Sequence, residues 1–155
     1  MAHCQGEARL ETAGGSIELG DMEGPVNVST AGGGIRIHSA KGNLKASTAG
    51  GGITVEEAGG SVHAGTSAGS ITVGFAGSLA GDSKLETAGG SITVRFPAQA
   101  AFNVDAEAVG GRVTSDLPVT IQGESKRSEL RGKVNGGGRS LRLSTSAGSI
   151  NIRKR

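Results

Sequence analysis

Basic side chains recur at one position of this sequence at nearly constant intervals. Most intervals are 18 or 21 residues, and one acidic residue, Asp105, takes the same position before the last member. Regularly spaced cations are suited to binding an extended anionic polymer, such as an acidic glycan, because opposite charges attract it along the row. The predicted ligand-binding stripe consists of Arg9, Asn27, Lys45, His63, Lys84 and Arg142.

Nucleic acid is the alternative anionic partner of such a stripe. Proteins that hold single strands combine cations with aromatic side chains on which the bases stack. The stripe contains no aromatic residue, and the whole chain has a formal net charge of only +2. We therefore expect no nucleic-acid partner.

Catalysis on a glycan would require two carboxylates, or one carboxylate with basic partners, on one face. Asp105 is the single acid at the stripe position, and we expect it one strand from Lys84, about 5 Å away. Glu107 lies nearby, whereas Glu56 and Glu57 fall at an expected solvated turn. The sequence predicts no catalytic residues, so a carbohydrate-active enzyme ranks third among the functions considered.

Metal and cofactor sites are not expected either. The calcium-binding β-roll requires an aspartate after its glycine-rich turn, and the segment that begins at Gly14 carries Leu19 at that position. Cys4 is the only cysteine, and His3, His38 and His63 share no recurring spacing.

Composition excludes a thick aromatic core. Glycine accounts for 29 of the 155 residues, hydrophobic residues make up 35%, and Trp and Tyr are absent. No apolar run approaches the roughly 18–20 residues that a transmembrane helix needs, so we expect no direct insertion into a membrane.

An internal repeat accounts for this composition. Its two halves alternate apolar and polar residues with the period of two that is typical of β-strands. Glycine-rich corners join the halves, where glycine allows positive φ and close approach of neighbouring coils. The pattern predicts a single-domain, all-β parallel solenoid of about 7–8 coils, with 18–21 residues per coil, stacked in sequence order. The copies occupy 12–19, 30–37, 48–55, 66–73, 87–94 and 145–152, with a degenerate copy at 108–115.

One region departs from the repeat. We expect an N-terminal tail at 1–7, a solenoid domain at 8–155, and an irregular coil with an excursion loop at 116–139. Residues 130–134 are interpreted as half of an eighth, looser coil. A further outward row is predicted to place Thr54, Thr72, Thr93 and Thr114 on four successive coils.

The chain resembles a bacterial domain family of unknown function that is labelled "putative adhesin". The resemblance rests on the T-A-G-G-x-I-x-V repeats and on the closing segments 115–119, 130–138 and 141–152. It implies a right-handed parallel β-helix placed at the cell envelope or surface. It brings no catalytic residues or cofactor, because the family has none agreed.

The compartment has two interpretations. Residues 1–5 contain no recognisable signal peptide. Either the sequence is a trimmed piece of an exported protein, which we favour, or the protein is cytoplasmic.

Charge is distributed unevenly along the chain. Residues 124–155 carry nine basic and two acidic side chains, whereas 1–123 carry seven basic and twelve acidic ones. A predicted assembly end, Arg153, Lys154 and Arg155, would either block a strand edge or dock on the acidic end of another copy. A capped monomer is favoured over weak end-to-end association.

These observations predict a non-enzymatic β-solenoid of the bacterial envelope. It would act as an adhesin or rigid spacer whose outward side chains bind a surface glycan or another envelope component weakly. The alternative is a self-assembling, head-to-tail scaffold.

Overall fold

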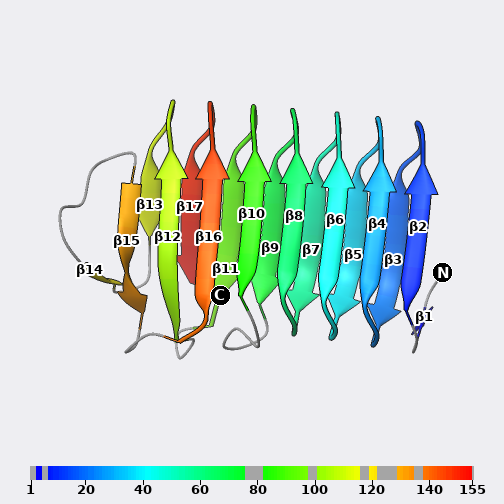
Figure 1. The fold of residues 1–155 in the computed structure, drawn as a ribbon, viewed down its shortest axis with the longest axis horizontal. Coiled ribbons are helices and arrows are strands. Elements are labelled where there is room, and N and C mark those ends of the chain that lie inside the picture. The colour runs from blue at the N-terminus through cyan, green and yellow to red at the C-terminus, as the bar shows by residue number, and fades with distance from the viewer. Residues whose placement is uncertain are drawn as a thin grey trace.

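The protein folds into two β-sheets that face each other (Figure 1), and buried hydrophobic side chains form a core. In this computed structural model the described residues are 3–4, 7–75, 82–97, 101–115, 119–121, 129–134 and 138–154. They form seventeen strands and no helix. The expected all-β fold is confirmed.

Sheet A has eight strands and sheet B has nine. In spatial order, sheet A contains β1 (His3–Cys4), β3 (Ile17–Met22), β5 (Ile35–Ala40), β7 (Ile53–Ala58), β9 (Ile71–Phe75), β11 (Ile92–Phe96), β17 (Ile150–Lys154) and β13 (Val113–Ser115). Sheet B contains β14 (Val119–Ile121), β15 (Glu129–Val134), β12 (Phe102–Ala108), β16 (Ser140–Thr145), β10 (Ser83–Thr87), β8 (Val62–Thr66), β6 (Leu44–Thr48), β4 (Val26–Thr30) and β2 (Ala8–Thr12).

Each solenoid coil contributes one strand to each sheet. The chain rises through sheet B, turns at a glycine-rich corner and descends through sheet A, which gives a right-handed solenoid (Figure 1). Seven coils form in this way, from β2–β3 to β12–β13 and β16–β17. The expected N-terminal tail supplies one short strand, β1, which pairs in parallel with the end of β3.

The core lies between the sheets, because both turn alternate residues inward. Ile53 and Ile71 are register partners, and both are fully buried. At the rod ends Leu10, Ile17 and Val113 are only partly buried, since each lacks a neighbouring coil on one side.

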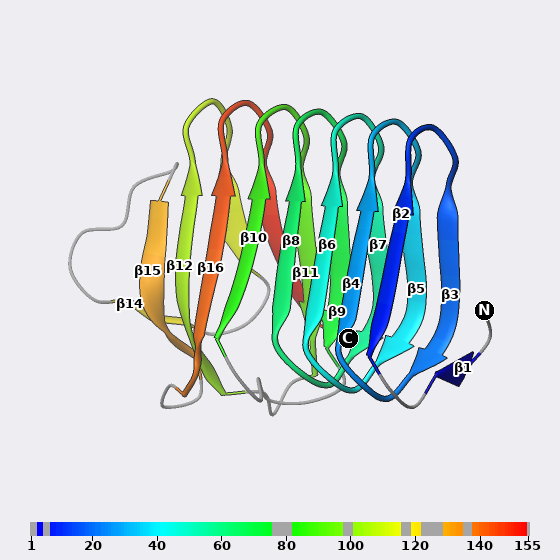
Figure 2. The same cartoon turned by 45° about the vertical axis from the view of Figure 1, so that its right-hand side comes forward.

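Buried threonines connect the coils at the corner that Figure 2 shows stacked along one edge of the rod. The hydroxyl of Thr66 donates to the Gly51 carbonyl of the preceding coil (2.9 Å) and accepts from the Gly69 amide of its own coil (3.2 Å). Each hydroxyl therefore satisfies two backbone groups at a buried turn. The members of this threonine ladder are Thr30, Thr48, Thr66, Thr87 and Thr145.

Replacing Thr66 with Val is expected to lower the free energy of unfolding by about 2–4 kcal/mol. The substitution leaves a partly buried carbonyl and a partly buried amide without these partners, and a buried unsatisfied group costs about 1–3 kcal/mol. Thr72 lies on the outer surface of β9, and Thr72→Val should change stability by less than about 0.5 kcal/mol. Urea denaturation of both variants measures the difference. Equal effects would show that the hydroxyl ladder contributes nothing.

Corner glycines are required for close approach. A Cβ on Gly69 would overlap the backbone of Gly51 and lie 2.7 Å from the Gly52 nitrogen. Gly33, Gly51 and Gly69 do not have φ in the left-handed range, so the expectation of positive φ is wrong for these corners.

The order of the coils differs from the order of the sequence. The C-terminal coil, β16–β17, lies between the coil β10–β11 and the coil β12–β13 (Figure 1). The expectation of coils stacked in sequence order is therefore wrong at this end of the rod.

The threonine ladder includes the inserted coil. Thr145 donates to the carbonyl of Gly90 in the coil β10–β11. The coil β12–β13 has Ala108 at the equivalent position, so it donates no such side-chain hydrogen bond to the inserted coil. The ladder therefore ends at Thr145.

Aromatic side chains connect the coils that flank the C-terminal coil. Phe96 stacks on Phe75 with ring centroids 4.5 Å apart, and on Phe102 with centroids 4.0 Å apart. The chain passes directly from Phe96 on β11 to Phe102 on β12, two positions along the stack. These are the only aromatic residues of the sequence, and all three are buried.

The interpretation of residues 130–134 as half of an eighth coil is wrong, because these residues belong to the antiparallel strand β15. This strand pairs antiparallel with β12 on one side and with β14 on the other. A reversed strand cannot continue a parallel solenoid, so sheet B ends in an antiparallel addition. Most of the expected excursion loop, at 122–128, lies outside the described residues.

Candidate ligand-binding face

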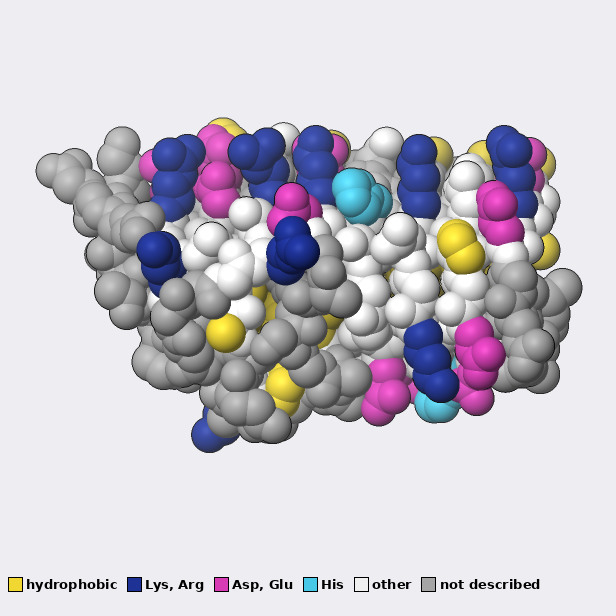
Figure 3. Space-filling view, turned by 60° about the horizontal axis from the view of Figure 1, so that its bottom comes forward, with side chains coloured by type: hydrophobic (Ala, Val, Ile, Leu, Met, Phe, Trp, Pro, Cys, Tyr) yellow, Lys and Arg dark blue, Asp and Glu magenta, His cyan; other side chains and the backbone are white. Residues whose placement is uncertain are grey.

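The predicted stripe forms one continuous row on the outer face of sheet B. The row crosses β2, β4, β6, β8, β10 and β16 in strict register, so its six members occupy successive strands. At about 4.8 Å per strand it extends about 24 Å. Figure 3 shows Lys and Arg side chains, with one His among them, in a row along the length of the molecule. In spatial order the members are Arg9, Asn27, Lys45, His63, Lys84 and Arg142.

Most of the stripe is open to solvent. Asn27 is half-buried, and the five other members are exposed. Among the described residues, Arg9, Lys45 and His63 make no ion pair, whereas Lys84 lies 3.1 Å from Glu86 on its own strand. The central cations are therefore available to an anion.

Small polar residues border the middle of the stripe. The row toward the threonine corner runs through Ser29, Ser47 and Gly65. A shallow hollow of about 450 Å³ lies on the other side. The charged groups in the middle of the stripe are therefore flanked by hydroxyl and amide groups that can bind sugar hydroxyls. The lining residues include Asn27, Asn43, Lys45, Ser61 and His63.

Asp105 does not lie beside Lys84, because the inserted strand β16 separates their strands. Its neighbours are Arg142 on β16 and Arg131 on β15. The carboxylate lies 3.3 Å from Arg131 Nε and 4.0 Å from an Arg142 guanidinium nitrogen. Asp105 therefore ends the basic stripe as part of an ion-paired group, and the spacing predicted from the sequence is wrong.

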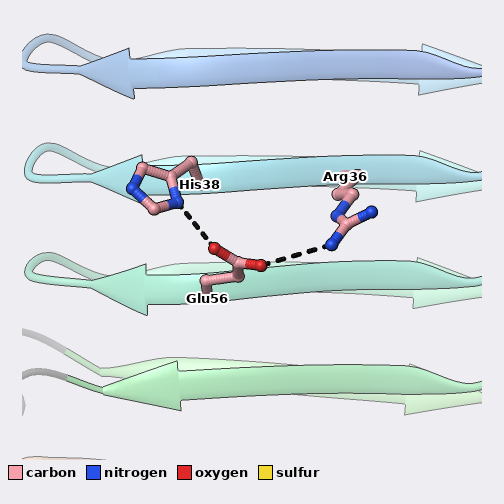
Figure 4. Close-up of polar contacts among 3 residues, drawn as sticks. All are labelled: Arg36, His38 and Glu56. Atoms are coloured by element: carbon pink, nitrogen blue, oxygen red, sulfur yellow. Dashed lines mark hydrogen bonds and ion pairs between the residues drawn. The ribbon is translucent and has the colours of Figure 1, made fainter.

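A second polar cluster, missed in the sequence, lies on sheet A (Figure 4). Glu56 on β7 receives a hydrogen bond from Arg36 (3.4 Å) and lies 2.6 Å from Nδ1 of His38. A hollow of about 660 Å³ lies beside the cluster, and Gly20, which has no side chain, is one of the residues that line it. The available signal was the 18-residue interval between His38 and Glu56, which is one coil.

The interaction between His38 and Glu56 depends on pH, because each shifts the pKa of the other. The hydrogen bond and charge of Glu56 raise the pKa of His38, with smaller contributions from Asp21 and Glu57. The same hydrogen bond, together with that from Arg36, lowers the pKa of Glu56. Both groups carry charge between the lowered pKa of Glu56 and the raised pKa of His38. Their stabilisation is lost when pH rises through the His38 pKa, or falls through that of Glu56.

Substituting Glu56 with Gln should return the pKa of His38 toward its ordinary value, because the largest cause of the shift is removed. An NMR titration of the imidazole protons measures this change. Glu57→Gln is the matched control and should lower the pKa much less, since Glu57 is the last of the causes. A His38 pKa that is unchanged in Glu56→Gln would contradict the assignment.

The predicted assembly end is not at an end of the rod. Arg153 and Lys154 belong to β17, opposite Arg95 and Phe96 of β11. On its other side β17 pairs with β13 at residues 150–152, so their coil is not the terminal coil of the rod. Arg155 lies outside the described residues.

The outward threonine row is also interrupted. Thr54, Thr72 and Thr93 are successive, but Asn151 of the inserted coil separates Thr93 from Thr114. Thr114 donates to the Asn151 side chain (2.7 Å). A row of four successive threonines is therefore absent from the described part of sheet A.

Comparison with known proteins identifies the family. The family model "Toastrack DUF4097" matches residues 5–153, almost the whole chain. The chain belongs to this family. A solved structure with the same fold is that of a "putative cell adhesion protein" from Clostridium sporogenes, with 13% sequence identity and a TM-score of 0.53. The match covers 97% of this chain and 93% of that one. No curated protein matches the chain.

In the described part of this Toastrack domain no cluster of metal-ligating side chains is present, since it contains no group of three or more His, Cys, Asp or Glu side chains that could hold a metal ion. Within the same residues there is no helix long and apolar enough to cross a membrane. The candidate functional features of the domain are therefore its two outer faces and the order of its coils.

Proposed function

We propose that this Toastrack domain is a non-enzymatic binding module of the bacterial cell envelope. Its ligand is an extended anionic glycan that lies along the outer face of sheet B. The observation that carries the proposal is the stripe itself, in which cationic or polar side chains occupy six successive strands in register.

The geometry supports a polymer over a compact ligand. The stripe extends about 24 Å at the spacing of β-strands, and the hollows beside it are shallow and open. A chain of anionic sugars can place carboxylates on the exposed cations and hydroxyls on the serines and asparagines at its sides. All three aromatic residues are buried, so nucleic-acid bases would find no stacking surface.

The structural similarity to the Clostridium sporogenes protein supports a location at the cell envelope. The Clostridium sporogenes protein with the same fold is described as a putative cell adhesion protein. A rigid rod with a linear binding face suits attachment to a surface polymer. The only acid in the row, Asp105, is ion-paired to arginines, which favours binding over acid–base catalysis.

Charge reversal of the stripe tests the proposal. The double variant Lys45→Glu with Lys84→Glu should weaken binding of polygalacturonate oligomers by about tenfold or more, since two attractive contacts become repulsive. Raising the ionic strength should weaken wild-type binding in the same direction. Isothermal titration calorimetry measures both effects, and melting curves confirm that the variant is folded.

The matched control is Lys41→Glu with Arg95→Glu. It changes the net charge equally, at exposed positions away from the outer face of sheet B. We expect its affinity to stay within about twofold of wild type. Equal loss in both double variants, or none in the stripe variant, would refute the stripe as the binding face.

A further inference from the structure

The C-terminal coil fills a space between two coils that precede it in the chain. Strand β16 pairs with β10 and β12, and β17 pairs with β11 and β13. We call this space, bounded by four strand edges, the slot. Both strands of the coil follow, in the chain, the four strands that bound the slot.

The slot accepts an ordinary internal coil. Leu141, Leu143, Ile150 and Ile152 are almost fully buried in it. Residues 145–152 read T-S-A-G-S-I-N-I, close to T-S-A-G-S-I-T-V at 66–73. The segment thus carries the inward residues and the repeat sequence that a coil needs in order to pair with a neighbouring coil on each side.

The connection into the slot crosses a strand. Strands β15 and β16 lie on opposite sides of β12, so the chain must pass from one side of β12 to the other between Val134 and Ser140. A connection that does not cross β12 would deliver the same coil to the equivalent slot of a second copy.

We infer that the C-terminal coil is exchanged between copies, so that the slot of one chain accepts residues 138–154 of a second copy. The exchanged and unexchanged forms share every contact of the coil with its slot, and they differ in the connection and in the entropy of association. The exchange takes place during folding, because the strands that fill the slot follow in the chain those that bound it. Reciprocal exchange closes a dimer, whereas one-way exchange joins copies in a row. This inference does not depend on the proposed glycan ligand.

Pairing across the slot supplies a direct test. Glu86 on β10 and Ser144 on β16 are register partners on the outer face of sheet B. Neighbouring strands place Cα atoms within the range that a disulfide spans. Two chains are prepared, one with Glu86→Cys and one with Ser144→Cys, and Cys4→Ser is included in both. They are unfolded, mixed, refolded together at high protein concentration and oxidised.

Exchange predicts a disulfide-linked dimer of the two different chains. The control mixture carries Ser29→Cys in one chain and Ser47→Cys in the other, which are register partners on β4 and β6, away from the slot. The slot pair should yield at least about fivefold more dimer than this control, decreasing when the proteins refold dilute. Equal yields would overturn the inference.

A second measurement requires no substitution. Wild-type protein refolded at high concentration should contain a dimer that persists after dilution, as judged by sedimentation velocity. Persistence is expected because leaving the slot requires breaking four strand ladders. Monomer alone at every refolding concentration would also overturn the inference.

Discussion

Removing residues 138–155 should detach residues 102–134 from the solenoid as well. Strand β12 reaches the rest of sheet B only through β16, and β13 reaches sheet A only through β17. The truncation removes four buried aliphatic side chains, each contributing about 1.5 kcal/mol or more, so we expect a loss of at least about 6 kcal/mol. Hydrogen exchange should show unprotected amides in β12 and protected amides in the coils at 8–96.

Deletion of the first coil, residues 1–22, is the matched control. That coil lies at the open end of the rod and contacts only the next coil, so its loss should leave β12 protected. In a linear repeat protein each unit depends only on its neighbours. If β12 stays protected after the C-terminal truncation, the coil at 102–115 can stack directly on β10–β11, and the structural requirement for the inserted coil is refuted.

Gly69→Ala should lower the free energy of unfolding by more than about 3 kcal/mol. The new methyl group would overlap the backbone of Gly51 in the coil below, and backbone cannot rotate away as a flexible side chain can. The two corners would have to separate, which strains the ladder of Thr66 and Thr87 on both sides. Overpacking that shifts side chains and backbone typically costs about 1–3 kcal/mol and occasionally more, and here the overlap is between two backbones. Chemical denaturation measures the loss.

Gly65→Ala is the control for glycine content. Gly65 lies within β8, and a Cβ there would be 4.0 Å from the Glu86 carbonyl oxygen, an ordinary contact. Because alanine restricts the unfolded chain more than glycine, we expect a small gain of up to about 1 kcal/mol. A comparable loss at positions 65 and 69 would contradict the role of close approach.

The period of the sequence was sufficient to predict the two sheets and their core. Inward positions such as Ile53, Ile71 and Ile92 are fully buried and aligned in register. This works because the alternation of a strand and the length of a coil are local properties. Stacked coils then bring equivalent positions together regardless of distant contacts.

Candidate surface sites were predictable to a smaller extent. The stripe was found because its members share one position in the repeat. The pair of His38 and Glu56 was not predicted, although one coil length separates the two residues, because two unlike residues that occur together once leave no periodic signal. The corner threonines were visible as the first residue of each repeat, but their two hydrogen bonds became evident only from the stacked backbones.

The sequence by itself determined which residues face inward, which share a row, and that this chain forms a parallel solenoid. Tertiary structure alone decided which coils are neighbours. Backbone ladders between parallel coils are nearly the same for any pair, so periodicity cannot distinguish adjacent from inserted coils. The observed order places Thr145 within the threonine ladder and Ala108 beyond its end. It moved Asp105 from Lys84 to Arg142 and Arg131, and it placed Arg153 inside sheet A, away from the end of the rod.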